Sequence, residues 1–349
     1  MNFLYLKIQV ILLILMDLKK LISILLFAFL CFSCTNSSKT HVYSGYALGT
    51  SFKIVYSSKY SLDNIEKLTD SIFFEINSSL STYLISSDIS KINNGIDSIK
   101  VDNHFKNVFN QSKVIWKSSN GFFDPTVGSL VNAYGLGPNI DTDRVFDIDS
   151  LMNLTGFENV TLLNDRIVKK KAGIFLDFNA IAKGYCVDVI SKMLIDNQIT
   201  NHLIEIGGEM YASGLNRTTN TKWRVGIADP LNSDPNSYNL RLSLKNKALA
   251  SSGNYRKFFI DSITGRKIVH TVNPKNGNAY STNVLGTSVL ADSCMTADGY
   301  ATALMAMPLE ESITLINSLL NIEAMIVYLD EEKNVKTYFT KNFENLILD

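Results

Sequence analysis

Two side chains near the C-terminal end of the sequence have the types and the spacing needed to bind a metal ion. Asp298 and Thr302 are four residues apart, so on an α-helix both oxygens lie on one face. The apolar run at 303–307 would anchor such a helix in a core. One carboxylate and one hydroxyl are too few ligands for Ca2+, but they suit Mg2+, which completes its shell with waters and phosphate oxygens. The same spacing is also typical of a helix cap or a solvated helix face.

A second segment, Asp-Phe-Asn-Ala-Ile-Ala-Lys-Gly at 177–184, places a carboxylate and a cation at the start of another apolar stretch. Lys183 would bring a positive charge to the same phosphates as the metal. Together with Asp298 and Thr302, this segment indicates phosphate-ester chemistry on a nucleotide-like substrate.

Further segments place glycine, hydroxyl-bearing or histidine residues at the ends of expected strands. Tyr-Gly-Leu-Gly at 134–137 allows close backbone approach to a ligand beside an aromatic wall, although a surface loop reads the same way. The strand ends at 206–209 and 251–256 could contact a ligand, and a β-bulge or an ordinary turn explains them equally well. His270 begins a turn where a general base would be useful, but a lone histidine is more often structural.

The first 33 residues have the features of an export signal. A charged leader at 17–20 precedes a ten-residue apolar run at 21–30, which is too short to span a bilayer in the usual way. Ser33-Cys34 followed by polar residues resembles the lipobox of bacterial lipoproteins. We therefore expect a signal peptide at 1–33, then lipidated Cys34 with a polar tether at 34–42.

A start at Met16 fits that leader better and would make residues 1–15 an upstream extension. The alternative is an uncleaved membrane anchor. In both cases the bulk of the chain lies outside the cytoplasm.

Charge and cysteine content exclude some functions. The chain carries 33 basic and 33 acidic residues, with no basic stripe, which argues against a nucleic-acid partner. Cys186 and Cys294 have no zinc-site spacing, and they favour two buried free thiols over a disulfide.

The elements that must position these residues predict an α+β fold. Helical periodicity covers 62–80, 105–118 and 183–197, and strands are expected at 52–56, 202–206, 223–228, 240–244, 248–251, 284–290 and 324–328. Because helices and strands do not alternate regularly, α+β fits better than a doubly wound parallel sheet. The mature residues can form one large domain or two intimate subdomains.

In their order and spacing, the segments above resemble the ApbE family of FAD:protein FMN transferases, which are often lipoproteins of the bacterial cell envelope. The resemblance runs from about Tyr46 to Met307 and makes 43–349 an ApbE-like flavin transferase domain. The matching segments are 49–50, 80–83, 87–93, 123–128, 176–184, 206–209, 252–255, 270–274 and 298–302.

The resemblance implies Mg2+-dependent transfer of the FMN moiety of FAD to a threonine of an acceptor protein, with release of AMP. The implied Mg2+ ligands are Asp298, Thr302 and the backbone carbonyl of Ala180. The implied catalytic residues are Asp298, Lys183 and His270. The implied FAD contacts, in a cleft between two subdomains with mixed and antiparallel sheets, are Leu48, Tyr83, Tyr134, Gly135, Leu136, Asp177, Lys183 and Val272.

The resemblance also implies a location and partners. The acceptors would be flavoproteins of envelope redox complexes. A lipid on Cys34 would hold the enzyme on the membrane, facing the extracytoplasmic side.

Two positions depart from the family pattern. The family usually reads His-x-x-Asp-Pro and Thr-Ser-Gly-Asp-Tyr, whereas this chain has Asn273 and Asn254 at the Asp positions. An amide keeps the turn geometry but loses the charge, which puts in doubt any role that requires a carboxylate there. Two other functions stay open: hydrolysis of FAD to FMN and AMP, and a lipoprotein that carries FAD without chemistry.

Overall fold

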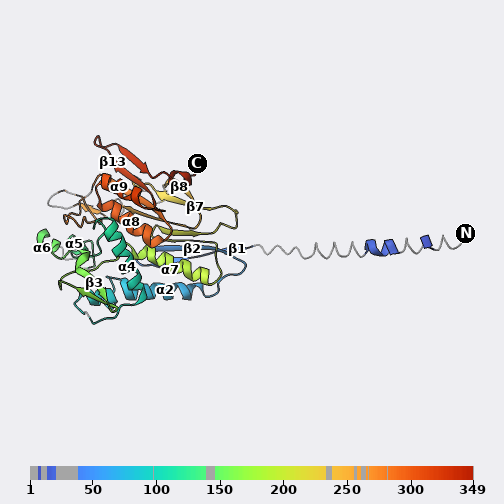
Figure 1. Cartoon of the computed structure of the whole chain (residues 1–349), viewed down its shortest axis with the longest axis horizontal. Helices are drawn as coiled ribbons and strands as arrows, with labels where there is room; N and C mark the ends of the chain where they lie inside the picture. The colour runs from blue at the N-terminus through green and yellow to red at the C-terminus, as the bar shows by residue number, and fades with distance from the viewer. Residues whose placement is uncertain are drawn as a thin grey trace.

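A computed structural model of the chain describes residues 7–8, 14–20, 38–96, 98–138, 146–232, 238–254, 258–260, 265, 267–280 and 282–348 (Figure 1). Most of the expected signal peptide, and Cys34 itself, lie outside these residues. Within them, no helix is both long enough and apolar enough to cross a membrane.

An eight-stranded antiparallel sheet forms the centre of the molecule, in the order β1-β2-β5-β6-β9-β12-β13-β14. Its strands are β1 Lys39–Ala47, β2 Thr50–Ser58, β5 His202–Ile206, β6 Glu209–Ser213, β9 Lys247–Gly253, β12 Val284–Ala291, β13 Glu323–Leu329 and β14 Val335–Phe339. Strand β1 begins at Lys39, so residues 39–42 of the expected tether segment lie in the sheet.

Both faces of this sheet are buried because apolar residues on its inner strands alternate between two hydrophobic clusters. In β2, Ile54 packs into the larger cluster and Val55 packs against the smaller one. Ile326 and Val327 of β13 divide between the same two clusters. The sheet is therefore the middle layer of three.

Helices cover the first face. They are α2 Ile65–Leu80, α3 Asp88–Asn93, α4 Asn103–Ser118, α7 Ala182–Asp196, α8 Cys294–Ala306 and α9 Leu309–Ser318. Two shorter helices, α5 Gly128–Ala133 and α6 Ile148–Met152, pack together in a third, smaller hydrophobic cluster. In Figure 1, α2, α4 and α7 lie together on one side of the molecule, and α5 and α6 lie at the end opposite β1. Nearly every residue of α8 is buried, as expected for a central helix that is apolar on all sides.

The hairpin of β7 Trp223–Ala228 and β8 Tyr238–Leu244 covers the second face, together with the short helix η2 Glu344–Leu346. Trp223 anchors this hairpin by donating its indole N–H to the Ser213 carbonyl at 2.8 Å. Two small hairpins, β3 Val160–Leu163 with β4 Arg166–Lys169 and β10 Phe258–Ile260 with β11 Lys267–Val269, complete the fold with η1 Phe157–Asn159.

The α+β expectation is confirmed, and β5 and β7 have the predicted bounds. Cys186 and Cys294 are buried and unpaired, also as predicted.

Candidate active site

The first turn of α7 lies directly against α8, so that the 177–184 and 298–302 segments meet. The Gly184 N–H donates to Asp298 Oδ2 at 3.0 Å. A Cβ atom at Gly184 would collide with the Cys294 carbonyl oxygen and would come within 2.8 Å of the Asp298 Cβ. Glycine at 184 therefore permits the close helix packing that brings Asp298 to the start of α7.

Lys183, beside that glycine, forms an ion pair that sequence reasoning missed. Its Nζ lies 2.5 Å from Glu209 Oε2, and Glu209 is 3% exposed. Glu209 follows Gly207 and Gly208, which both have positive φ and form the two-residue turn between β5 and β6. The β-bulge interpretation of this segment is therefore wrong. The sequence did contain a signal for this residue, because Glu209 is a carboxylate directly after two glycines that form a turn. Only the glycines of this segment entered the sequence-based prediction.

Asp298 sits in a buried environment that disfavours its ionised form. It is 3% exposed, and burial raises the pKa of its carboxyl to about 8; the Glu209 charge adds to this shift and Lys183 opposes it. When Asp298 is ionised, the two buried carboxylates and one ammonium carry excess negative charge, which a bound divalent cation would offset.

The oxygen donors at this position fit Mg2+. Thr302 lies one turn after Asp298 on α8, and its Oγ1 is 3.4 Å from Ser252 Oγ at the end of β9. The Ala180 carbonyl accepts no backbone N–H from the described residues, because Gly184, its usual helical partner, donates to Asp298 instead. Among the described residues no group of three or more His, Cys, Asp or Glu could hold a metal, so hydroxyl and carbonyl ligands would be needed.

Asp177 lies in the turn before α7. Its carboxylate accepts from the Asn179 backbone N–H at 2.6 Å and from Asn179 Nδ2 at 3.1 Å, while burial raises its pKa. Tyr83 is 62% exposed, and burial together with the nearby Asp177 charge raises the pKa of its phenol. These two predicted FAD contacts therefore lie close together, with the tyrosine open to solvent.

The Phe-Asp-Pro-Thr-Val-Gly turn at 123–128 has a positioning role. Asp124 accepts from the Thr126 and Phe157 backbone N–H groups at 2.8 and 3.0 Å. The Pro125 carbonyl then accepts from the Asp177 N–H at 2.8 Å. This turn therefore holds the segment that carries Asp177.

A separate hydrophobic cluster gathers three other predicted FAD contacts. Tyr134 and Val272 are buried in it, and Leu136 packs against it. Gly135 has a φ of 69° and follows the end of α5, which allows the chain to turn between Tyr134 and Leu136. His270 is half-buried directly after β11, two residues before Val272.

Leu48 and Gly49 form the two-residue turn between β1 and β2, and both have positive φ. A Cβ atom at Gly207 would lie 2.8 Å from the Thr50 Cγ2, so this turn lies beside the β5–β6 turn that precedes Glu209. The Leu48–Gly49 turn is therefore next to the turn that leads into Glu209.

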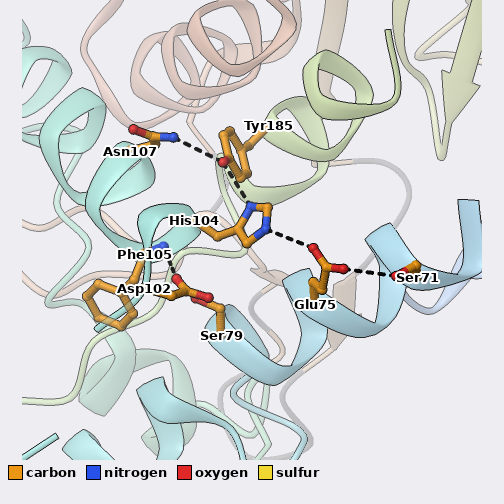
Figure 2. A network of polar contacts seen from close by, with 8 residues as sticks. All are labelled: Ser71, Glu75, Ser79, Asp102, His104, Phe105, Asn107 and Tyr185. Atoms are coloured by element: carbon orange, nitrogen blue, oxygen red, sulfur yellow. Dashed lines mark hydrogen bonds and ion pairs between the residues drawn. The ribbon is translucent and has the colours of Figure 1, made fainter. Parts of the chain in front are cut away.

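A polar network on the outer side of α7 fixes this helix to α2 and α4 (Figure 2). Tyr185 Oη is 2.9 Å from His104 Nδ1 and accepts from Asn107 Nδ2 at 3.2 Å, while His104 Nε2 is 3.4 Å from Glu75 Oε2. Tyr185 lies two residues after Lys183, so the network also orients the first turn of α7. A hollow of about 580 Å3 beside Tyr185 and Asp188 contains none of the predicted FAD contacts.

The sequence profile of the ApbE family matches residues 48–326 of the chain. The chain belongs to the ApbE family. Among curated ApbE relatives, the FAD:protein FMN transferase of Vibrio cholerae is 32% identical over 309 residues, covering 86% of this chain and 91% of the relative. The Haemophilus influenzae protein of the same name is 28% identical and covers 83% of this chain and 88% of the relative.

Solved ApbE structures have the same fold. The Vibrio cholerae flavin transferase ApbE superposes with a TM-score of 0.79 at 29% identity, covering 88% of this chain and 99% of that structure. The apo form of the Pseudomonas stutzeri flavinyl transferase ApbE gives a TM-score of 0.77 at 27% identity, covering 88% of this chain and 97% of that structure.

The two departures from the ApbE pattern have local explanations. Asn273 Oδ1 accepts from the Lys275 N–H at 2.8 Å, so the amide keeps the turn geometry, as predicted. Asn254 is 4% exposed, and its side-chain oxygen Oδ1 accepts no hydrogen bond from the residues that the structure describes. A neutral amide is less costly than a carboxylate in such a buried position.

Proposed function

We propose that this protein transfers the FMN moiety of FAD to a threonine hydroxyl of an acceptor protein, as the names of its relatives state for them. The observation that carries the proposal is the contact of α7 with α8, where Asp298 accepts from the Gly184 N–H and interacts electrostatically with the neighbouring Lys183. A cation and a buried carboxylate beside oxygen donors suit a pyrophosphate and its metal ion.

Mg2+ held by Asp298, Thr302 and the Ala180 carbonyl would supply charge stabilisation to the pyrophosphate. Lys183 would bind phosphate oxygens through its ammonium, and Asp177 and Tyr83 would contact FAD beside it. The cluster of Tyr134, Leu136 and Val272 would offer the ring system an apolar wall. Leu48 and Gly135 complete the proposed FAD contacts. The chain therefore contributes mainly alignment and charge, as phosphoryl transfer requires.

In the transfer step, the threonine Oγ forms a bond to the phosphorus on the FMN side of FAD. The bond from that phosphorus to the bridging oxygen breaks, and AMP leaves with the electron pair. His270 would accept the threonine proton or orient the hydroxyl.

Two other outcomes use the same site. Water in place of threonine would split FAD into FMN and AMP. A carrier would hold FAD without breaking a bond, but a carrier does not need a cation and a carboxylate directed at phosphate, so Lys183 and Asp298 favour catalysis. AMP release from the FAD-loaded protein on addition of Mg2+ separates both reactions from storage.

We also propose that the protein is lipid-anchored through Cys34 on the extracytoplasmic side of the bacterial cell envelope, where its acceptors are flavoproteins of redox complexes. The Ser33-Cys34 pattern and the polar residues after it support this location. Replacement of Cys34 by Ser should move the protein from the membrane fraction to the soluble fraction. Equal membrane retention of both forms would contradict the lipid anchor.

The function is tested by incubating the purified full chain with FAD, Mg2+ and a threonine-bearing acceptor domain. Intact mass and released nucleotide are measured together. An FMN-sized gain on the acceptor with matching AMP supports the transferase. AMP and free FMN without an adduct would support the hydrolase, and unchanged FAD would support the carrier.

A further inference from the structure

We propose that Glu209 is a positioning residue for FMN transfer, which acts by holding the Lys183 ammonium in the orientation that the FAD pyrophosphate needs. The inference rests on the proposed function and adds a residue to its site. Its basis is the 2.5 Å ion pair between the buried Glu209 carboxylate and the ammonium of Lys183, a residue whose side chain is partly exposed.

The exposure of the two side chains differs in a way that fits this role. The Glu209 side chain is 4% exposed and the Lys183 side chain is 32% exposed. Glu209 thus lies on the interior side of the ion pair, and part of the Lys183 side chain is exposed. An ammonium has three N–H donors, so an ion pair with one carboxylate leaves donors for phosphate oxygens.

Glu209 is attached to a stiff part of the fold, whereas Lys183 has a flexible four-carbon stem. Glu209 opens β6 and pairs with Ile206 across the Gly207–Gly208 turn. The Gly207 N–H donates to the Ser51 carbonyl at 3.1 Å, and the Gly208 N–H donates to Glu205 Oε1 at 2.6 Å. The backbone that carries the Glu209 carboxylate is therefore held in place, and the carboxylate can limit the positions that the Lys183 ammonium adopts.

The charges around the pair predict how its loss will appear. Lys183 is the only cation that the described residues place in an ion pair with Glu209. Replacing Glu209 by Gln preserves shape but removes a negative charge that competes with phosphate for the ammonium. FAD should therefore bind more tightly, while the less restricted ammonium is misplaced in the transition state. A loss of fold alone would weaken binding and transfer together.

The test is a double-mutant cycle in the full chain, made of Glu209→Gln, Lys183→Met and the double variant. The turnover number kcat is measured at saturating FAD, and the FAD dissociation constant Kd is measured by flavin fluorescence without metal. Asp292→Asn is the control, because Asp292 has an ion pair of similar length with Lys247 Nζ, at 2.6 Å, in an exposed position.

We expect Glu209→Gln to lower kcat by about tenfold or more, within the roughly hundredfold loss that a misplaced group can cause. Its FAD Kd should fall several-fold. In the Lys183→Met background, Glu209→Gln should change neither value by more than about twofold, since the residue that it positions is gone. Asp292→Asn should match the parent.

Three results would overturn the proposal. They are a parent-like kcat in Glu209→Gln, an equal loss of kcat from Glu209→Gln with and without Lys183, and an FAD Kd that is unchanged or higher in Glu209→Gln. If the parent chain forms no FMN adduct, the transferase function fails separately. The FAD-binding measurements then still test the role of Glu209. A lower FAD Kd in Glu209→Gln that disappears in the Lys183→Met background supports the proposal, and an equal change of Kd in both backgrounds refutes it.

Discussion

The side-chain amide of Asn93 forms two hydrogen bonds with the backbone of Leu176, 83 residues later in the chain. Asn93 Nδ2 donates to the Leu176 carbonyl at 2.9 Å, and the Leu176 N–H donates to Asn93 Oδ1 at 2.8 Å. Leu176 is fully buried and directly precedes Asp177. The end of α3 therefore fixes the position of a proposed FAD contact.

Replacing Asn93 by Ala should weaken FAD binding, because two backbone groups of Leu176 lose their partner. The free energy of unfolding should fall by about 1–3 kcal/mol. FAD titration and urea unfolding measure the two effects. Asn94→Ala is the control, since Asn94 is exposed at the helix end; parent-like FAD affinity in Asn93→Ala would contradict the positioning role.

Replacing Asp298 by Ala should abolish FMN transfer and leave the fold intact, because it removes the only carboxylate proposed to bind Mg2+. Intact mass of the acceptor measures transfer, and circular dichroism checks the fold. Asp298→Asn keeps the shape and should be equally inactive. Transfer at the parent rate by Asp298→Ala would show that the metal assignment is wrong.

Gly184→Ala should destabilise the protein by about 1–3 kcal/mol, because the added methyl group overpacks the contact of α7 with Cys294 and Asp298. Thermal unfolding measures the loss. Gly286→Ala in β12 is the matched control. The added Cβ atom would lie 3.5 Å from its nearest neighbour, the Cβ of Pro230, which is an ordinary van der Waals contact. Equal melting temperatures for the two variants would mean that the two helices can move apart to accept the methyl group with no loss of stability.

Acidification should destabilise the protein through His202. This side chain is fully buried, its Nε2 is 2.8 Å from Ser191 Oγ, and burial lowers the pKa of its imidazole to about 4. Its unfolded pKa is about 6.5, so below that pH the unfolded state binds more protons, and the stability present above pH 6.5 is lost toward pH 4.

The His202 contribution to the loss between pH 7 and pH 5 should be about 2 kcal/mol. It is measured as the difference in pH dependence of urea unfolding between the parent and His202→Gln. Asp188, whose pKa is raised to about 6 by burial, has the opposite pH dependence and cancels in this difference. Identical pH profiles would mean that His202 accepts a proton in the folded protein.

The fold was predictable where burial imposes a period on the sequence. Strands β5 and β7 and helices α4 and α7 were found because their apolar residues recur at strand or helix spacing. The edge strand β1 was missed, since Lys39, Ser44 and Gly45 face water and give no apolar alternation. The short hairpin β3–β4 is too brief to show a period.

The candidate site was predictable as segments but not as contacts. Asp298 and Lys183 were identifiable from charge beside an apolar helix, yet their meeting depends on Gly184, whose role appears only when α7 packs on α8. Glu209 lies 26 positions after Lys183 and on a different element, so no spacing rule connects them. Long-range pairs of this kind arise from strand order, which the sequence does not display.

Strand β1 has a consequence for the reach of the enzyme. It starts at Lys39, next to the segment proposed to carry the lipid, and it ends at the Leu48–Gly49 turn beside the site. Nine residues at roughly 3.3 Å each make β1 a rigid strut of about 30 Å. If Cys34 carries the lipid, the length of β1 therefore separates the start of the folded domain, where the anchor joins it, from the turn beside the proposed site.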